Sequence, residues 1–367
     1  MNKAYSIVWN SSRQAWVVAS ELARGHGFVL AKNTLLVLTV ASTVGNAFAQ
    51  NVSSGVVSNG VVSSGETQVV YSNGQTSNAT VNSGGIQNVN NGGKTTSTTV
   101  NSSGAQNVGN SGTAISTIVN SGGVQRVSSG GVTSATSLSG GAQNIYNLGH
   151  ASSTIIFNGG IQTILSGGIS EDTNISSDGQ QRVSSGGVAS GTTINSSGTQ
   201  NILSGGSTSA TVVNSGGFQR VSAGGTATGT KLSAGTQNIS SGGKASATEV
   251  FSGGKQNIYA DGIASGTRIN QSGYVNISSG GYAESTIINS GGTQSVLSNG
   301  LASGTMINNS GRENVSNGGA SYNAIINDGG NQYIYNNGEA TGATVNTSGF
   351  QRVSSGGTAT GTQLSGG

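Results

Sequence analysis

The sequence of 367 residues contains no proline and no cysteine, and only 7% of it is charged and 5% aromatic. The absence of cysteine excludes a disulfide framework. The absence of proline suits continuous main-chain hydrogen-bond ladders, which proline would interrupt. Sixty-four glycines could indicate a disordered Gly/Ser linker. A strict apolar register, described below, argues against disorder because a disordered chain needs none.

Residues suited to catalysis are scarce. Histidine occurs only as His26 and His150, which leaves no second base for a histidine triad and no zinc cluster. We expect His150 to be a surface residue in a turn. Glu171 and Asp172 form the only acidic pair, and neighbouring strand residues point to opposite faces. We therefore expect no enzyme, no cofactor and no metal site.

Glutamine recurs with a fixed period. Sixteen anchor positions are spaced by 19 residues, except for two steps of 18, and Val275 and Glu313 occupy two of them. The other fourteen are Gln68, Gln87, Gln106, Gln125, Gln143, Gln162, Gln181, Gln200, Gln219, Gln237, Gln256, Gln294, Gln332 and Gln351. A period of this length is the signature of a solenoid.

The period predicts the coil. Val or Ile follows every anchor at two residues, and Val, Ile or Leu follows at thirteen, as in Val89 and Val100. Small residues hold the eighth position and Thr or Ala the eleventh. Because strand side chains alternate, we predict two short strands with apolar inner positions and a third side that accepts only small residues. The fold class is therefore all-β, a single-stranded parallel β-helix with about one repeat per coil, right-handed by the strong default for parallel crossovers.

Glycine occupies the sixth position after every anchor and, in all repeats but the first, the second position before it. We interpret the pair at the sixth position as a turn that needs positive φ.

The anchor glutamines share the inner face with Val or Ile, so we predict a ladder in which each amide bonds its neighbours above and below. The alternative is that glutamine lies at a corner and reaches water. The predicted ladder comprises Gln87, Gln106, Gln125, Gln143, Gln162, Gln181, Gln200 and Gln219.

Residues 1–49 differ from the rest. Four basic residues precede or flank an apolar run at 34–44, and an A-x-A site ends at Ala49. We predict an extended signal peptide over 1–49, with Gln50 as the new N-terminus. The run is too short for a transmembrane helix. Residues 50–65 are predicted as a capping half-coil and residues 66–367 as β-helix repeats. The chain ends in mid-repeat, so we expect a fragment of a longer protein.

Cleavage at this site changes the net charge. The whole chain carries +3, whereas residues 50–367 hold ten basic and ten acidic residues. We expect neither a basic stripe for nucleic acid nor a polybasic membrane patch. Arg126, Arg182, Arg220 and Arg352 each follow an anchor by one residue. We interpret them as solvated outward charges.

Serine supplies most of the outward chemistry. Pairs of serine precede one turn and single serines lead the other, either because serine bonds its local backbone or because it accepts O-linked sugar. Physical chemistry of the sequence leaves both open. The candidates are Ser83, Ser102, Ser121, Ser128, Ser129, Ser184, Ser185, Ser196, Ser215, Ser240, Ser241, Ser252, Ser278, Ser279, Ser290, Ser354 and Ser355.

Two stretches resemble a known family. Residues 1–5 and 16–24 are similar to the extended signal peptide of type V autotransporters, and residues 119–131 resemble repeats of the self-associating autotransporters, the family of the AIDA diffuse-adherence adhesin. The resemblance implies a right-handed β-helical passenger exported through the periplasm and displayed on the outer membrane or released. It also implies autoaggregation, biofilm formation, adhesion to a host-cell receptor, and heptose added to turn serines by a cytoplasmic heptosyltransferase.

The expected partners are therefore other copies of the chain, a host receptor, the heptosyltransferase, and the export and outer-membrane assembly machinery. The C-terminal β-barrel translocator of the family does not occur in this sequence. Two other functions compete with adhesion. The segment could be an inert stalk for an adhesive region outside it, or an ice-binding β-helix, although the Thr column is predicted to face inward.

Overall fold

A computed structural model describes residues 5–10, 15–20 and 49–366. The chain divides into two units, residues 1–38 and 39–367. In the first, β1 (Tyr5–Asn10) and β2 (Ala15–Ser20) pair antiparallel, with Trp9 opposite Trp16. The apolar run at 34–44 and residues 46–48 of the predicted cleavage site lie outside the described residues. None of the described segments forms a helix long and apolar enough to cross a membrane.

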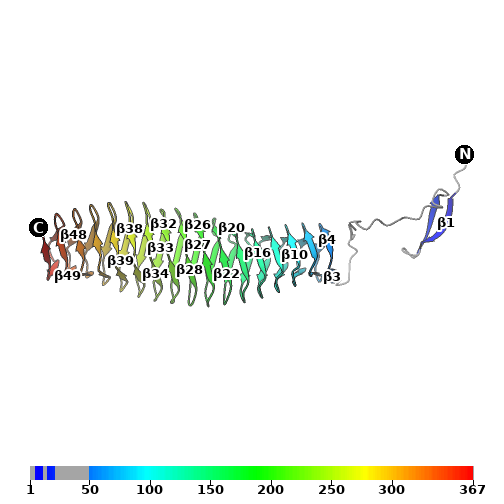
Figure 1. Cartoon of the computed structure of the whole chain (residues 1–367), viewed down its shortest axis with the longest axis horizontal. Helices are drawn as coiled ribbons and strands as arrows, with labels where there is room; N and C mark the ends of the chain where they lie inside the picture. Colours follow the sequence, from blue (N-terminus) through cyan, green and yellow to red (C-terminus); the bar gives the residue numbers. More distant parts are fainter. Residues whose placement is uncertain (1–4, 11–14, 21–48, 367) are drawn as a thin grey trace. The chain divides into compact units, whose positions relative to one another are not determined.

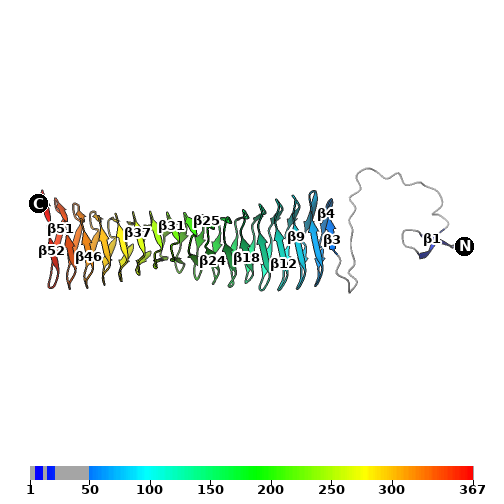
Figure 2. The same ribbon diagram turned by 90° about the horizontal axis from the view of Figure 1, so that it is seen from below.

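The second unit is a stack of coils, and each coil contributes one strand to each of three parallel sheets (Figures 1 and 2). Each strand lies beside the equivalent strand of the next coil. The cartoon therefore shows rows of parallel arrows along one axis. The prediction of a right-handed parallel β-helix with one repeat per coil is confirmed. There is one correction: the side that carries small residues is itself a strand, so each coil has three strands where the sequence predicted two.

The Gln sheet contains the anchor positions. Its strands are β3 (Ala49–Val52), β6 (Thr67–Val70), β9 (Ile86–Val89), β12 (Ala105–Val108), β15 (Val124–Val127), β18 (Ala142–Ile145), β21 (Ile161–Ile164), β24 (Gln180–Val183), β27 (Thr199–Ile202), β30 (Phe218–Val221), β33 (Thr236–Ile239), β36 (Lys255–Ile258), β39 (Tyr274–Ile277), β42 (Thr293–Val296), β45 (Arg312–Val315), β48 (Asn331–Ile334) and β51 (Phe350–Val353).

The second sheet carries the small inner residues. Its strands are β4 (Gly55–Ser58), β7 (Gly74–Ser77), β10 (Lys94–Thr96), β13 (Thr113–Ile115), β16 (Val132–Ser134), β19 (His150–Ser152), β22 (Ile169–Glu171), β25 (Val188–Ser190), β28 (Ser207–Ser209), β31 (Thr226–Thr228), β34 (Lys244–Ser246), β37 (Ile263–Ser265), β40 (Tyr282–Glu284), β43 (Leu301–Ser303), β46 (Ala320–Tyr322), β49 (Glu339–Thr341) and β52 (Thr358–Thr360).

The third sheet carries the apolar residue thirteen positions after the anchor. Its strands are β5 (Val61–Val62), β8 (Thr80–Val81), β11 (Thr99–Val100), β14 (Ile118–Asn120), β17 (Ser137–Ser139), β20 (Ile155–Phe157), β23 (Asn174–Ile175), β26 (Thr193–Ile194), β29 (Val212–Val213), β32 (Lys231–Leu232), β35 (Glu249–Val250), β38 (Arg268–Ile269), β41 (Ile287–Ile288), β44 (Met306–Ile307), β47 (Ile325–Ile326), β50 (Thr344–Asn346) and β53 (Gln363–Ser365).

Register follows the sequence period. Gln106 lies beside Gln87 and Gln125, and Val108 beside Val89 and Val127. The Val, Ile and Leu residues at the two apolar positions are buried in nearly every coil and form the core. Each buried side chain of this kind contributes on the order of 1.5–3 kcal/mol to folding.

The first coil begins earlier than the sequence suggested. Residues 49–62 supply β3, β4 and β5, one strand for each sheet, where a half-coil over 50–65 was predicted. Gln50 lies beside Gln68 in the Gln sheet. Gln50 precedes Gln68 by 18 residues, which is one more instance of the shorter step. We missed it because the predicted signal peptide ended directly before this residue.

The recurrent glycines have a different cause from the one predicted. In the repeat that starts at Gln219, Ala223 and Gly224 have positive φ, whereas Gly225, the invariant position, does not. A Cβ atom on Gly225 would lie 2.6 Å from the carbonyl oxygen of Ile202 in the coil before. Gly104, two residues before its anchor, meets Val81 at the same distance. Both glycines are therefore required by close approach between coils, and the adjacent residues supply the positive φ.

The predicted glutamine ladder is confirmed. From Gln87 to Gln256, each Nε2 donates to the Oε1 of the preceding anchor at 2.6–2.8 Å. The Thr eleven residues after the anchor donates to the same oxygen, as Thr192 does to Gln181 at 3.1 Å. All of these glutamines are fully buried. The alternative, in which the amide reaches water at a corner, is wrong.

The direction of donation reverses at one rung near the C-terminal end, Gln294. Val275 provides no acceptor, and Gln294 instead donates forward to Glu313 at 2.9 Å. Gln332 donates to the other carboxylate oxygen of Glu313 at 2.7 Å. The Glu313 side chain has no amide N–H to donate, so both neighbouring glutamines donate to its oxygens. As a result the Oε1 of Gln294 and the hydroxyl of Thr286, which would otherwise bond an anchor glutamine, have no partner.

Replacing one internal rung should destabilise the stack. Gln181→Leu keeps a similar volume but removes the acceptor of Gln200 and Thr192. Leaving these buried donors unsatisfied costs about 1–3 kcal/mol each. We expect a lower urea midpoint by circular dichroism. Asn201→Leu, on the outer face of the next strand, is the control; an equal loss in both variants would contradict a stabilising role for the ladder.

Val275 and Glu313 should be energetically coupled. Glu313→Gln restores a donor at that rung, but Gln294 then needs an acceptor at position 275, which only Val275→Gln supplies. We expect the gain in unfolding free energy of the double variant to exceed the sum of the changes in the two single variants by about 1–3 kcal/mol. Additive effects within about 0.5 kcal/mol would show that the two positions are independent.

Candidate functional site

The candidate serines lie in two rows of turns. One row follows the Gln strand, as at Ser128–Gly131, where the amide of Gly131 donates to the carbonyl of Ser128 at 2.8 Å. Ser129 and Gly130 both have positive φ, 50° and 73°, as in a type I′ turn. We call this row the rear ridge. In four of the five serine pairs the first serine is half-buried and the second exposed; in the last coil both are exposed.

The other row precedes the Gln strand, and we call it the front ridge. At 120–123 the amide of Gly123 donates to the carbonyl of Asn120 at 2.8 Å. Here only Gly122 has positive φ, so Ser121 occupies the first central position of a turn like type II. All of the predicted serines in this row are exposed: Ser83, Ser102, Ser121, Ser196, Ser215, Ser252 and Ser290.

Stacking brings the serines into lines. Each Gln strand starts directly after a front-ridge turn and ends at a rear-ridge turn, so the ridges border the same sheet on both edges. Successive coils lie about 4.8 Å apart. Serines separated by 19 residues therefore become neighbours, and the outer face of the Gln sheet lies between two hydroxyl-bearing edges.

Several equivalent serines escaped the sequence analysis. Ser166, Ser204 and Ser298 occupy the same exposed turn position as Ser129, but Leu rather than Ser precedes them. Ser64, Ser177 and Ser233 are their counterparts on the front ridge. The signal that could have found them is the offset of four residues after or before the anchor, rather than the local Ser-Ser or Ser-Gly pattern.

Surface asparagines form a second kind of ladder that the sequence analysis also missed. On the front ridge Asn101 donates to Asn82 at 2.9 Å. A longer run joins five coils at 2.9–3.1 Å. Its members are Asn270, Asn289, Asn308, Asn327 and Asn346. These asparagines occupy the first position of each front-ridge turn, next to the serine position. The sequence signal that identifies them is a constant offset of fourteen residues after the anchor.

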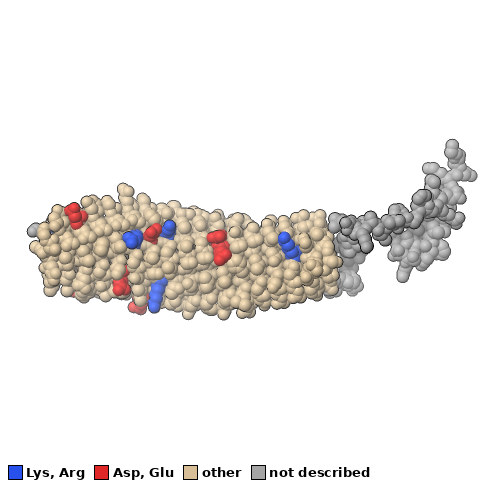
Figure 3. All heavy atoms as spheres, in the orientation of Figure 1, with Lys and Arg blue, Asp and Glu red and all other residues tan. Residues whose placement is uncertain are grey.

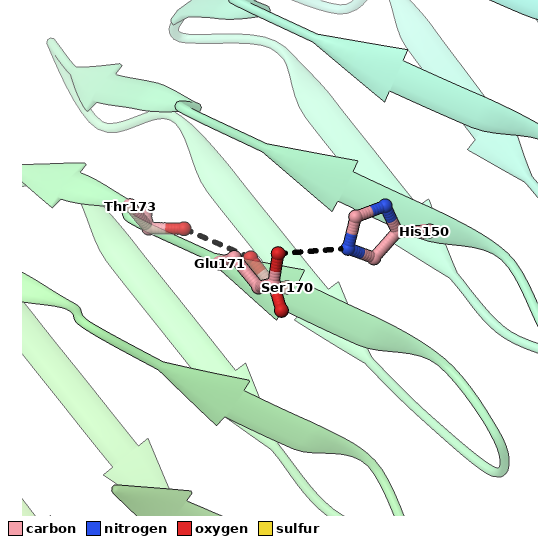
Figure 4. Close-up of polar contacts among 4 residues, drawn as sticks. All are labelled: His150, Ser170, Glu171 and Thr173. Atoms are coloured by element: carbon pink, nitrogen blue, oxygen red, sulfur yellow. Dashed lines mark hydrogen bonds and ion pairs between the residues drawn. The ribbon is translucent and has the colours of Figure 1, made fainter. Parts of the chain in front are cut away.

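The sequence predicted that His150 lies in a surface turn, which is wrong. His150 begins strand β19 and is half-buried. Its Nε2 lies 3.1 Å from Oε2 of Glu171 on β22 (Figure 4). Ser170 precedes Glu171 but points inward, where it contacts Thr173 at 2.9 Å. Because Ser170 and Glu171 face opposite sides of the strand, the Ser170 hydroxyl cannot act as a nucleophile beside the His150–Glu171 pair.

The remaining charges are dispersed. Across residues 5–10, 15–20 and 49–366, no group of three His, Cys, Asp or Glu side chains could hold a metal ion. Figure 3 shows a largely uncharged surface, on which the few basic and acidic residues of the visible face lie singly or in small groups of mixed sign. The Thr column faces the interior, as predicted, with Thr98, Thr117 and Thr192 fully buried. It is therefore not displayed for contact with ice.

Comparisons with known proteins agree with this architecture. Residues 1–50 match the family described as the extended signal peptide of the type V secretion system. Residues 145–198, 260–311 and 314–367 match the family described as "Adhesin of bacterial autotransporter system, probable stalk". The predicted resemblance to both is confirmed, while cleavage between Ala49 and Gln50 stays a prediction.

Two individual proteins are similar. A stretch of 72 residues, 20% of this chain, is 79% identical to the autotransporter adhesin AIDA-I of Escherichia coli and spans 6% of its length. The crystal structure of a TibC-catalysed hyper-glycosylated TibA fragment is 33% identical, with a TM-score of 0.59, over 86% of this chain and all of that fragment. These similarities, together with the export signal, indicate a non-enzymatic structural protein displayed at the cell surface. The chain belongs to the AIDA-type adhesins of bacterial autotransporter systems, and its coils form a stretch of their passenger stalk.

Proposed function

We propose that this segment is itself adhesive: it associates with copies on other cells, promotes autoaggregation and biofilm formation, and contacts host cells. The observation that carries the proposal is the repetition of one surface along the stack, with equivalent side chains about 4.8 Å apart. Weak contacts repeated on a rigid rod act at high effective concentration once the first has formed. Residues 50–367 carry no net charge, so little long-range repulsion keeps two such rods apart.

We also propose that serines of the two ridges carry O-linked heptose, added in the cytoplasm by a heptosyltransferase before export and outer-membrane assembly. Two observations support this. The ridge serines at the outer turn positions are exposed, so a folded coil can accommodate a sugar there. In addition, the similar TibA fragment is described as hyper-glycosylated through TibC.

The competing function is an inert stalk that presents an adhesive region elsewhere. The family description of a probable stalk favours it, and the long continuous core makes the segment a suitable rigid spacer.

We expect heptose to be attached to serines that face outward and not to serines that face inward. After co-expression with a heptosyltransferase, peptide mass spectrometry of the exported chain should find heptose at positions such as Ser129, Ser185 and Ser121. The buried Ser170 and Ser321 should remain unmodified, because a sugar there would prevent the coil from packing. Heptose found equally on these inward serines of the folded, exported chain would contradict the proposal.

Cell settling separates an adhesin from a stalk. Residues 50–367 would be displayed on a surrogate autotransporter barrel, with and without the heptosyltransferase, and sedimentation of the cells recorded. We expect faster settling than with the barrel alone, and the difference between the two conditions measures what sugar adds. Normal settling despite confirmed surface display would leave the segment as a stalk.

A further inference from the structure

All of the charged side chains on the outer face of the Gln sheet are basic. Its strands carry six exposed basic side chains, and the single acidic residue in them, Glu313, is buried in the ladder. The six are Arg126, Arg182, Arg220, Lys255, Arg312 and Arg352. The near-neutral composition hides this face, because the other acidic residues in strands lie on the other two sheets: Glu171, Glu284 and Glu339, which are exposed, and Glu249, which is half-buried.

These cations form a spaced row along the stack. They lie on β15, β24, β30, β36, β45 and β51, so two or three coils separate each from the next. With coils about 4.8 Å apart, the spacing is roughly 10–14 Å. Only an extended ligand could contact several of them at once.

Neighbouring side chains already orient most of the row. Arg126 donates to Asn107 at 3.3 Å and Arg182 to Gln180 at 3.1 Å. The guanidinium of Arg220 lies 5.6 Å from the ring centroid of Phe218, and that of Arg312 lies 4.9 Å from the ring centroid of Tyr333. Such side chains lose less conformational entropy when a ligand binds.

None of the six is neutralised by a carboxylate among the described residues, where the ion pairs are His150–Glu171 and Lys231–Glu249 on the other sheets. Asp178, Asp261 and Asp328 lie in turns at the edges of the Gln sheet and reduce the local charge without pairing with the row. Outward asparagines fill much of the space between the cations, with amides that can bond hydroxyl groups, as in the pair Asn257–Asn238.

We infer that the outer face of the Gln sheet binds a linear acidic polysaccharide on the surface of a contacted cell. Arginine pairs with carboxylate and sulfate groups, the asparagine amides suit sugar hydroxyls, and a row that runs along the stack of coils matches an extended chain. Duplex DNA fits less well, since the deoxyribose units within its strands offer no free hydroxyl groups to the asparagine amides. The inference rests on the proposed adhesive function and names the chemical class of its partner.

The test uses the exported chain and immobilised heparin, a linear polysaccharide with sulfate and carboxylate groups. The variant Arg182→Gln, Arg220→Gln, Lys255→Gln removes three charges from the row. The matched control Lys231→Gln, Lys244→Gln, Arg268→Gln removes three exposed charges from the other sheets. We expect salt-sensitive binding of the unmodified chain, roughly tenfold weaker binding of the row variant, and little change in the control.

Three results would overturn the inference. Absence of heparin binding at about 0.15 M salt, or equal weakening in the two triple variants, would show that the face has no specific role. Stronger displacement by duplex DNA than by soluble heparin at equal charge would assign the face to nucleic acid. Neutral dextran on the same support controls for contacts that do not need charge.

Cell settling with the same variants keeps the two proposals apart. If the row variant loses heparin binding but settles normally, both stand, because self-association then uses another face. If the unmodified chain binds heparin but never settles, self-association fails and the polysaccharide site remains.

Discussion

The structure depends on in-register main-chain pairing between successive coils. The amide of Thr99 donates to the carbonyl of Ala79 at 2.8 Å, and the amide of Ile118 to that of Thr98 at the same distance one coil later. This repeat places like over like, so every requirement at one position recurs about 4.8 Å away. Glycine is needed wherever the turn passes beneath the carbonyl of the coil before, and glutamine can be buried because another glutamine lies beside it.

Burial of a polar column couples its members. An amide both donates and accepts, so a run of glutamines satisfies itself, whereas valine or glutamate changes what the neighbours must do. Val275 and Glu313 are two such exceptions, separated by one rung. Val275 leaves Gln294 without an acceptor on one side, and Glu313 supplies one on the other. Together they confine the cost to two unpaired atoms, those of Gln294 and Thr286.

The same stacking divides the surface into chemically distinct zones. Hydroxyls that face inward, such as Thr192, belong to the ladder, whereas those at the turns form two exposed ridges. Between the ridges lies a sheet whose outward charges are all positive, and the acidic residues of the other strands lie on the remaining sheets. A stalk built in this way can offer exposed hydroxyl groups and a charged face on one rod, with each surface repeated along its length.

The sequence by itself determined the period, the parallel β-helix, the buried columns and the turn serines, because each of these follows from residue type at a fixed offset. Tertiary structure decided the rest. The third strand was missed because Ala114 and its equivalents are too small to give an apolar signal. The first coil, the role of Gly225 and the direction of donation in the ladder all arise from contacts between residues of successive coils. Lys255 and Arg312 precede their anchors by one residue, whereas the other four arginines of the row follow theirs. Only the stacking of coils shows that all six lie on the same face, because residues of different coils are distant in the sequence.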